Sequence, residues 1–165
     1  MALSMACVCP ASAVESRASF PGRADRLPSP DGQYRVRWVE ARDAEHPHRL
    51  LLSHGQESVE LLSFPRSVDV LWSPDSTHLA ITNRWASDES TVLVWTDFAS
   101  PPMDLLEALE MQEGQRVEHW GAHHLYLSVV RWTKTDSLEL RLSGYGKVAV
   151  ERRYVYTLGR AFRRM

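Results

Sequence analysis

The chain has 165 residues, of which 44% are hydrophobic and 24% are charged, and its formal net charge is -2. This length is sufficient for one domain with its own hydrophobic core. The composition excludes a chain that stays disordered, and the near-neutral charge excludes a strongly basic nucleic-acid-binding protein. No apolar run reaches the roughly 18 residues that a membrane-spanning helix needs, so we expect no membrane span.

Residues 1–13 predict a truncated signal peptide. The segment MALSMACVCPASA carries no charge and ends in an A-x-A-like cleavage site at residues 11–13, although the positive residues that normally precede the apolar stretch are absent. Both cysteines, Cys7 and Cys9, fall in this segment. The remaining chain therefore contains no disulfide, no thiolate nucleophile and no cysteine-ligated zinc. We expect a periplasmic or secreted protein, with a cytoplasmic protein as the alternative.

Residues 14–29 combine Pro, Gly, Ser and mixed charge without hydrophobic periodicity, which is typical of a linker. We expect residues 30–165 to form a single β-rich domain. Its first strand is indicated by Tyr34, Val36 and Trp38, which alternate with arginines. This period of two places the bulky side chains on one face of a sheet and the charges on the other.

Further β-prone runs, separated by turn residues, follow along the chain. We expect strands at residues 49–53, 59–64, 68–72, 78–83, 91–97, 125–132, 137–143 and 147–158. The sequence therefore predicts a mainly β, antiparallel fold.

One short helix is expected near residues 101–113, in the segment SPPMDLLEALEMQEG. Ser100 is expected to cap it, Asp104 suits the positive end of the helix dipole, and Gly114 suits the helix end. Three leucines share one helical face and predict packing against a sheet: Leu105, Leu106 and Leu109.

A Ser-Pro-Asp turn occurs twice, at Ser29 and at Ser73, 44 residues apart, and each copy opens a strand-loop-strand unit. Proline presets φ for a tight turn, aspartate can accept from its own following backbone, and Gly32 or Ser76 lets the chain leave the turn. A period of about 40 to 45 residues is typical of four-stranded propeller blades. The sequence therefore predicts an internal repeat.

The sequence around these turns resembles the WD-like repeats of TolB-type bacterial β-propellers, in which Trp-Ser-Pro-Asp-Gly precedes a strand. The resemblance is carried by Trp72, Ser73, Pro74, Asp75, Leu79, Ala80 and Ile81, and in the first copy by Ser29, Pro30, Asp31 and Gly32. A propeller normally needs at least about four blades, whereas this chain has material for two or three. We therefore expect antiparallel propeller-blade-like hairpins that form a small closed sandwich or barrel, or a partial propeller completed by oligomerisation.

The loop NRWASDES, between the two strands of the second unit, is the candidate binding site. Arg84, Trp85, Asp88 and Glu89 would be displayed at a hairpin tip, and Trp with Arg is a pairing enriched at interface hot spots. The alternative is that Trp85 folds back onto the sheet. The resemblance implies a non-enzymatic protein-binding module of the cell envelope, for example an inhibitor or immunity-type protein.

The chain contains no Walker loop, no G-x-S-x-G elbow, no dinucleotide signature and no H-E-x-x-H motif. Its one histidine-rich segment is EHWGAHH, where His119, His123 and His124 lie beside Glu118. If the chain turns at Gly121, these histidines could bind zinc, and the alternative function is a metal-dependent hydrolase. We favour the interpretation that these histidines bind no metal. We expect a protein partner, no cofactor and no nucleic-acid ligand, and a homo-oligomer stays open.

Overall fold

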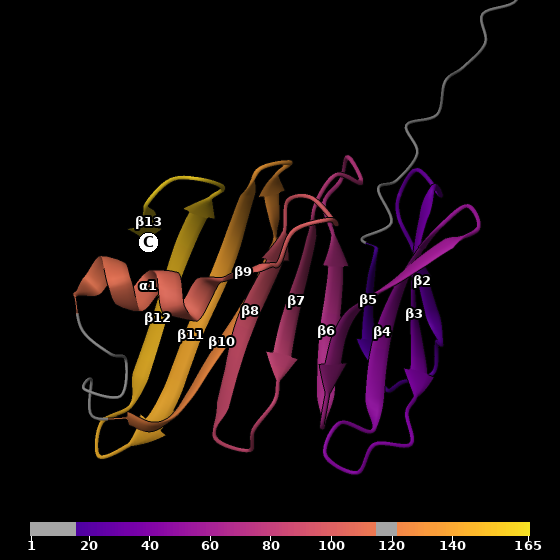
Figure 1. The fold of residues 1–165 in the computed structure, drawn as a ribbon. Coiled ribbons are helices and arrows are strands. Elements are labelled where there is room, and N and C mark those ends of the chain that lie inside the picture. Colours follow the sequence, from indigo (N-terminus) through magenta and orange to yellow (C-terminus); the bar gives the residue numbers. More distant parts are fainter. Residues whose placement is uncertain (1–15, 115–121) are drawn as a thin grey trace, which may run out of the picture.

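The structure, a computed structural model, describes residues 16–114 and 122–165. They form a mainly β fold, with 58% of the described residues in strands and one short helix. Figure 1 shows the strands side by side across the molecule, with α1 lying over the part that holds β10 to β12. The expectation of a mainly β fold with one helix is confirmed, and the described residues form no closed barrel or propeller.

The first sheet has four antiparallel strands in the order β2-β3-β4-β5. They are β2 (Arg26–Pro28), β3 (Tyr34–Glu40), β4 (His48–His54) and β5 (Glu57–Phe64). Val36 in β3 is fully buried, whereas its neighbours Arg35 and Arg37 are exposed. The alternation predicted for this strand therefore separates a core face from a solvent face.

The second sheet has the order β1-β6-β7-β8-β10-β11-β12-β13, and β9 also pairs with β8. Its first strands are β1 (Arg17–Phe20), β6 (Ser67–Trp72), β7 (Leu79–Arg84), β8 (Glu89–Trp95) and β9 (Met103–Asp104). Its last strands are β10 (Ala122–Lys134), β11 (Ser137–Gly146), β12 (Val150–Thr157) and β13 (Phe162–Arg164). Two antiparallel parts, β1-β6-β7-β8 and β10-β11-β12-β13, are joined by parallel pairing of β10 with β8.

Strand β10 continues from this junction across the neighbouring strands. The amide of Val129 donates to Thr82 Oγ1 in β7 (3.1 Å), and Trp132 Nε1 donates to the carbonyl of Leu71 in β6 (3.4 Å). The guanidinium of Arg17 in β1 donates to the carbonyl of Val130 (2.7 Å). The part β10-β11-β12-β13 is therefore held against the part β1-β6-β7-β8 by contacts from three different strands.

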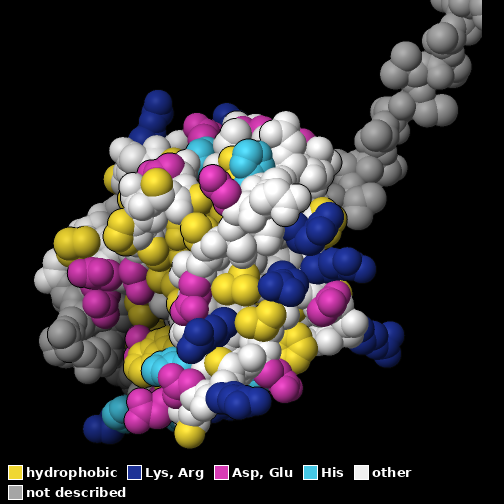
Figure 2. Space-filling view, turned by 45° about the vertical axis from the view of Figure 1, so that its right-hand side comes forward, with side chains coloured by type: hydrophobic (Ala, Val, Ile, Leu, Met, Phe, Trp, Pro, Cys, Tyr) yellow, Lys and Arg dark blue, Asp and Glu magenta, His cyan; other side chains and the backbone are white. Residues whose placement is uncertain are grey.

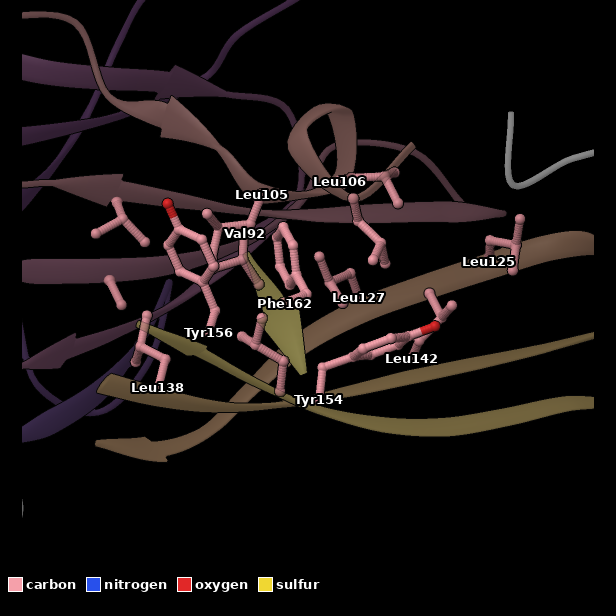
Figure 3. Close-up of a cluster of buried hydrophobic side chains, with 14 of the residues drawn as sticks. Val92, Leu105, Leu106, Leu125, Leu127, Leu138, Leu142, Tyr154, Tyr156 and Phe162 are labelled. Atoms are coloured by element: carbon pink, nitrogen blue, oxygen red, sulfur yellow. The ribbon is translucent and has the colours of Figure 1, made fainter. Parts of the chain in front are cut away.

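Two hydrophobic clusters lie on either side of β7 and β8. One cluster joins the first sheet to this part of the second and includes Leu50, Phe64 and Ile81. The other joins α1 to the last strands (Figure 3) and includes Leu105, Leu127, Val92, Tyr154 and Phe162, among others. Because β7 and β8 contribute to both clusters, they carry near-continuous runs of buried residues rather than a strict alternation.

The helix α1 (Leu105–Glu113) begins later than the sequence predicts. Its N-cap is Asp104, whose carboxylate accepts from the amides of Leu106 (2.8 Å) and Glu107 (3.2 Å), so the expectation that Ser100 caps the helix is wrong. The pairing of β9 with β8 keeps residues 103–104 extended and delays the helix start. Gly114 ends the helix at φ 68°, and the three leucines predicted to pack on the sheet are buried.

The expectation of a linker over residues 14–29 needs correction for its described part. Arg17–Phe20 forms β1 at the edge of β6, and Arg26–Pro28 forms β2 against β3. Phe20 and Leu27 belong to the first hydrophobic cluster. Strands of four and three residues are too short to show a hydrophobic period in the sequence, and only their partners identify them. The short β13, which follows the predicted run 147–158, was likewise not expected.

The two Ser-Pro-Asp turns have the same local geometry. In each, the serine hydroxyl donates to the aspartate two residues on and accepts from the amide five residues on, at Tyr34 (3.0 Å) and at His78 (2.9 Å). The fourth residue has positive φ in both, 74° at Gly32 and 65° at Ser76. Moreover, the amide of Asp31 donates to Ser76 Oγ (3.0 Å). The repeated motif therefore folds twice in the same way, and the two copies touch.

Candidate functional site

The loop of residues 85–88 connects β7 to β8 and displays a large aromatic side chain. Trp85 directly follows the last residue of β7 and is 47% exposed. Large aromatic side chains usually bury most of their surface in a folded domain. Trp85 therefore buries about half of its surface and leaves the other half open to solvent.

Arg84, at the end of β7, is anchored by a carboxylate on the neighbouring strand. Its guanidinium donates to Asp69 in β6, and Asp69 also accepts from the hydroxyl of Ser19 in β1. Burial raises the pKa of Asp69, but the hydrogen bonds from Arg84 and Ser19 outweigh it and hold the pKa below the ordinary 3.8. The cation beside Trp85 is therefore fixed in position.

The loop backbone is held by β10. The carbonyl of Asp88 accepts from the amide of Leu125 (2.8 Å), and the carbonyl of Ser87 accepts from the hydroxyl of Tyr126 (2.8 Å). Glu89, the first residue of β8, pairs in register with Leu125. These contacts fix the loop to a strand that lies more than 30 positions later in the sequence.

An aromatic group on β10 and β11 adjoins the loop. The rings of His124 and Tyr145 stack with centroids 4.2 Å apart, and the hydroxyls of Tyr126 and Tyr145 lie 3.4 Å apart. Tyr145 is 55% exposed. The hydrogen bond with Tyr145, with burial and the charge of Asp88, raises the pKa of Tyr126 above its ordinary 10.0, so this phenol stays protonated and can donate at neutral pH.

We call the loop and this aromatic group together the tip surface. Its members are Arg84, Trp85, Asp88, Glu89, His124, Tyr126 and Tyr145. The sequence places the first four on one loop, and the structure adds the three aromatic residues. Position 124 lies opposite position 145, and position 126 lies two residues further along β10. This signal can be recognised only when the pairing of β10 with β11 is known.

The histidine segment gives no metal group in the part of the chain that the structure describes. His119 and Glu118 lie outside the described residues, His123 is exposed, and His124 stacks on Tyr145. No group of three metal-type ligands occurs among residues 16–114 and 122–165.

A groove of about 450 Å³ lies at the other end of the second sheet, between α1, β9 and β12. Its lining includes Met103, Met111, Tyr156 and Phe162. The hydroxyl of Tyr156 donates to the sulfur of Met103 (2.9 Å), and the amide of Phe162 donates to the side-chain carbonyl of Gln112 (2.6 Å). The side-chain polar atoms of Tyr156 and Gln112 at this groove therefore already have partners within the fold.

Comparisons with known proteins add no relative. No family model, no curated protein and no solved structure matches this chain. In the described residues no helix is both long and apolar enough to cross a membrane.

Proposed function

We propose that the chain is a non-enzymatic protein-binding module that engages its partner through the tip surface. The observation that supports this proposal best is the exposed Trp85 on a loop whose two ends are fixed. Tryptophan, tyrosine and arginine are the residues most enriched at the energetic centres of protein interfaces. A loop that is already ordered loses little conformational entropy when it binds, which favours affinity.

The proposal includes the finer description of the fold as blade-like. Support comes from the two Ser-Pro-Asp turns, which share their hydrogen bonds and their positive φ at the fourth residue. Each turn leads into an antiparallel strand series, β3-β4-β5 after the first and β7-β8 after the second. These repeats resemble propeller blades, and such blades commonly present their connecting loops to partners.

We further propose that the protein acts in the periplasm or outside the cell. This part rests on the uncharged segment and cleavage-site pattern of residues 1–13. Fractionation of cells that express the full chain tests it, together with N-terminal sequencing of the product. Cleavage after Ala13 and recovery outside the cytoplasm support export, whereas an intact chain in the cytoplasm contradicts it.

Site-specific photocrosslinking tests the tip surface. A photoreactive phenylalanine analogue replaces Trp85 in the full chain, and a control carries it in place of Val59, which is 48% exposed on β5 of the other sheet. We expect a discrete protein adduct from the first position and none from the second. Equal crosslinking at both positions, or none at either, contradicts the proposal.

The partner identified in this way allows a quantitative test. Trp85→Ala is expected to weaken binding at least about fivefold, the loss typical of a hot-spot truncation, while Val59→Ala leaves the affinity unchanged. Circular dichroism and thermal unfolding of both variants show whether the fold is kept. Unchanged affinity of a folded Trp85→Ala variant removes the loop from the interface.

A further inference from the structure

The outer face of the first sheet carries a concentration of positive charge. Register and burial place Val36, Leu50, Leu52 and Phe64 on the core side of this sheet. The residues on the opposite side form what we call the arginine face: Arg26, Pro28, Arg35, Arg37, Val39, Arg49, Leu51, Ser53, Ser58, Glu60 and Ser63. This face holds four arginines and one carboxylate. Figure 2, turned toward this end of the molecule, shows dark blue Lys and Arg side chains across the middle and right of the view.

Two of these four arginines have a carboxylate partner, and two have none among the described residues. Glu60 lies 3.5 Å from Arg49, and Asp25 lies 3.7 Å from Arg26 in an exposed pair. Among the described residues, Arg35 and Arg37 form no ion pair. Two arginines of the face are therefore without a carboxylate partner in the part of the chain that the structure describes.

The arrangement of these charges opposes folding. Arg26 in β2 lies directly opposite Arg37 in β3. Arg35 lies two residues before Arg37, on the same side of β3. Like charges in directly opposed positions of an antiparallel pair destabilise the sheet. The opposed charges of Arg26 and Arg37 therefore do not stabilise the pairing of β2 with β3.

We propose that the arginine face binds an extended acidic segment of a partner protein, at a site separate from the tip surface. Two residues along a strand span about 6.4 to 6.8 Å, so Arg35 and Arg37 have the same spacing as alternate side chains of an extended partner chain. A segment with Asp or Glu at every second position presents its carboxylates at this repeat. Guanidinium groups bind carboxylates with two parallel hydrogen bonds, which gives both affinity and orientation.

The same face is poorly suited to nucleic acid. Proteins that bind single strands combine positive charge with aromatic side chains on which the bases stack. The outward residues of β2 to β5 include no aromatic ring, and the uncharged side chains beside the arginines are Val39, Leu51 and serines. A carboxylate partner therefore fits this surface better than a base-stacking one.

A direct binding measurement tests the proposal. The probe is a fluorescein-labelled synthetic peptide in which Glu alternates with Thr, titrated with the full chain and followed by fluorescence anisotropy. The double variant Arg35→Gln with Arg37→Gln replaces both unpaired arginines. It is expected to bind the peptide at least about tenfold more weakly, because each substitution removes charge-assisted hydrogen bonds. The matched control is Arg163→Gln with Arg164→Gln, which removes the same charge from β13 of the second sheet and is expected to change affinity less than about twofold.

The outcomes separate this proposal from its alternatives. Absence of binding to the native chain, or equal weakening in both double variants, overturns it. Tighter binding of an oligothymidylate with the same number of charges also overturns it, in favour of nucleic acid. Trp85→Ala is expected to leave the peptide affinity unchanged, so failure of the tip surface and failure of the arginine face are distinguishable.

Discussion

The outer face of the first sheet and the outer face of the last strands carry the same charged residue types in different arrangements. On β10, β11 and β12, Arg131 Nε and Arg153 Nη1 lie 2.8 and 3.1 Å from the carboxylate of Glu139, whose side chain is only 4% exposed. Arg141 pairs with Glu151 at 2.7 Å. On the arginine face, in contrast, Arg35 and Arg37 have no such partner among the described residues.

This difference shows that exposed arginines in one protein can have two roles. Arginines that cover a buried carboxylate are part of the fold, because that carboxylate would otherwise be desolvated without compensation. Arginines that face each other without carboxylates cost stability and remain free for a ligand. Loss of the first kind is therefore expected to change stability, and loss of the second kind to change binding.

The largest effect is expected when Glu139 loses both partners. Arg131→Ala with Arg153→Ala should lower the free energy of unfolding by about 2 to 3 kcal/mol, less than for a fully buried ion pair because the guanidinium groups are half-exposed. Arg35→Ala with Arg37→Ala should change it by no more than about 0.5 kcal/mol. Urea denaturation of the two double variants measures both values, and equal losses would break the comparison.

A smaller effect is expected at Asp69, whose carboxylate accepts hydrogen bonds from Arg84 and Ser19 near the tip surface. Asp69→Asn should lower the free energy of unfolding by about 1 to 2 kcal/mol at neutral pH. Because the pKa of Asp69 is lower in the folded state than in the unfolded chain, this contribution is present above pH 3.8 and is lost as the pH falls through the folded pKa. Denaturation from pH 7 to pH 2.5 should show the stability curves of native chain and variant converging, and parallel curves would contradict this.

The exposed ion pair between Arg141 and Glu151, on the outer face of the last strands, is expected to contribute less to the free energy of unfolding. Arg141 and Glu151 are both about half-exposed, and such pairs contribute about 0.2 to 1 kcal/mol that salt reduces. Arg141→Ala should therefore cost less than either change above. Thermal unfolding at low and high salt measures this cost, and a loss independent of salt would indicate packing of the arginine stem instead.

The smallest effect has the opposite sign. Arg37→Gln removes the like charge opposite Arg26 and should raise the free energy of unfolding by a few tenths of a kcal/mol at low salt. Paired thermal melts at low ionic strength measure it. A clear loss of stability would show that Arg37 supports the sheet, and would weaken its assignment to a ligand.

Local signals in the sequence predicted much of the fold. The alternation of Tyr34, Val36 and Trp38 identified β3, and the two Ser-Pro-Asp motifs identified turns with the same hydrogen bonds. Two strands were not predicted, Arg17–Phe20 and Arg26–Pro28. They are too short to show a hydrophobic alternation, and their stability comes from the strands they pair with. The helix start was missed because Met103–Asp104 is kept extended by β8.

The candidate site was only half visible in the sequence. Its first four members are close together in the sequence and could therefore be predicted from it: Arg84, Trp85, Asp88 and Glu89. Their surroundings come from β10 and β11, since Tyr126 binds the loop carbonyl at Ser87 and stands beside Tyr145. No local pattern predicts that a later strand joins β8 in parallel, because such pairing depends on long-range packing.

The sequence by itself determined the elements whose causes are local: strand alternation, turn chemistry and the leucine stripe that α1 buries. Tertiary structure alone decided which charges are matched, because Arg131, Glu139 and Arg153 come from three strands whose register brings them together. It also placed Arg26 opposite Arg37. Side chains interact across a sheet according to pairing and face, and these are set by the packing of the whole chain.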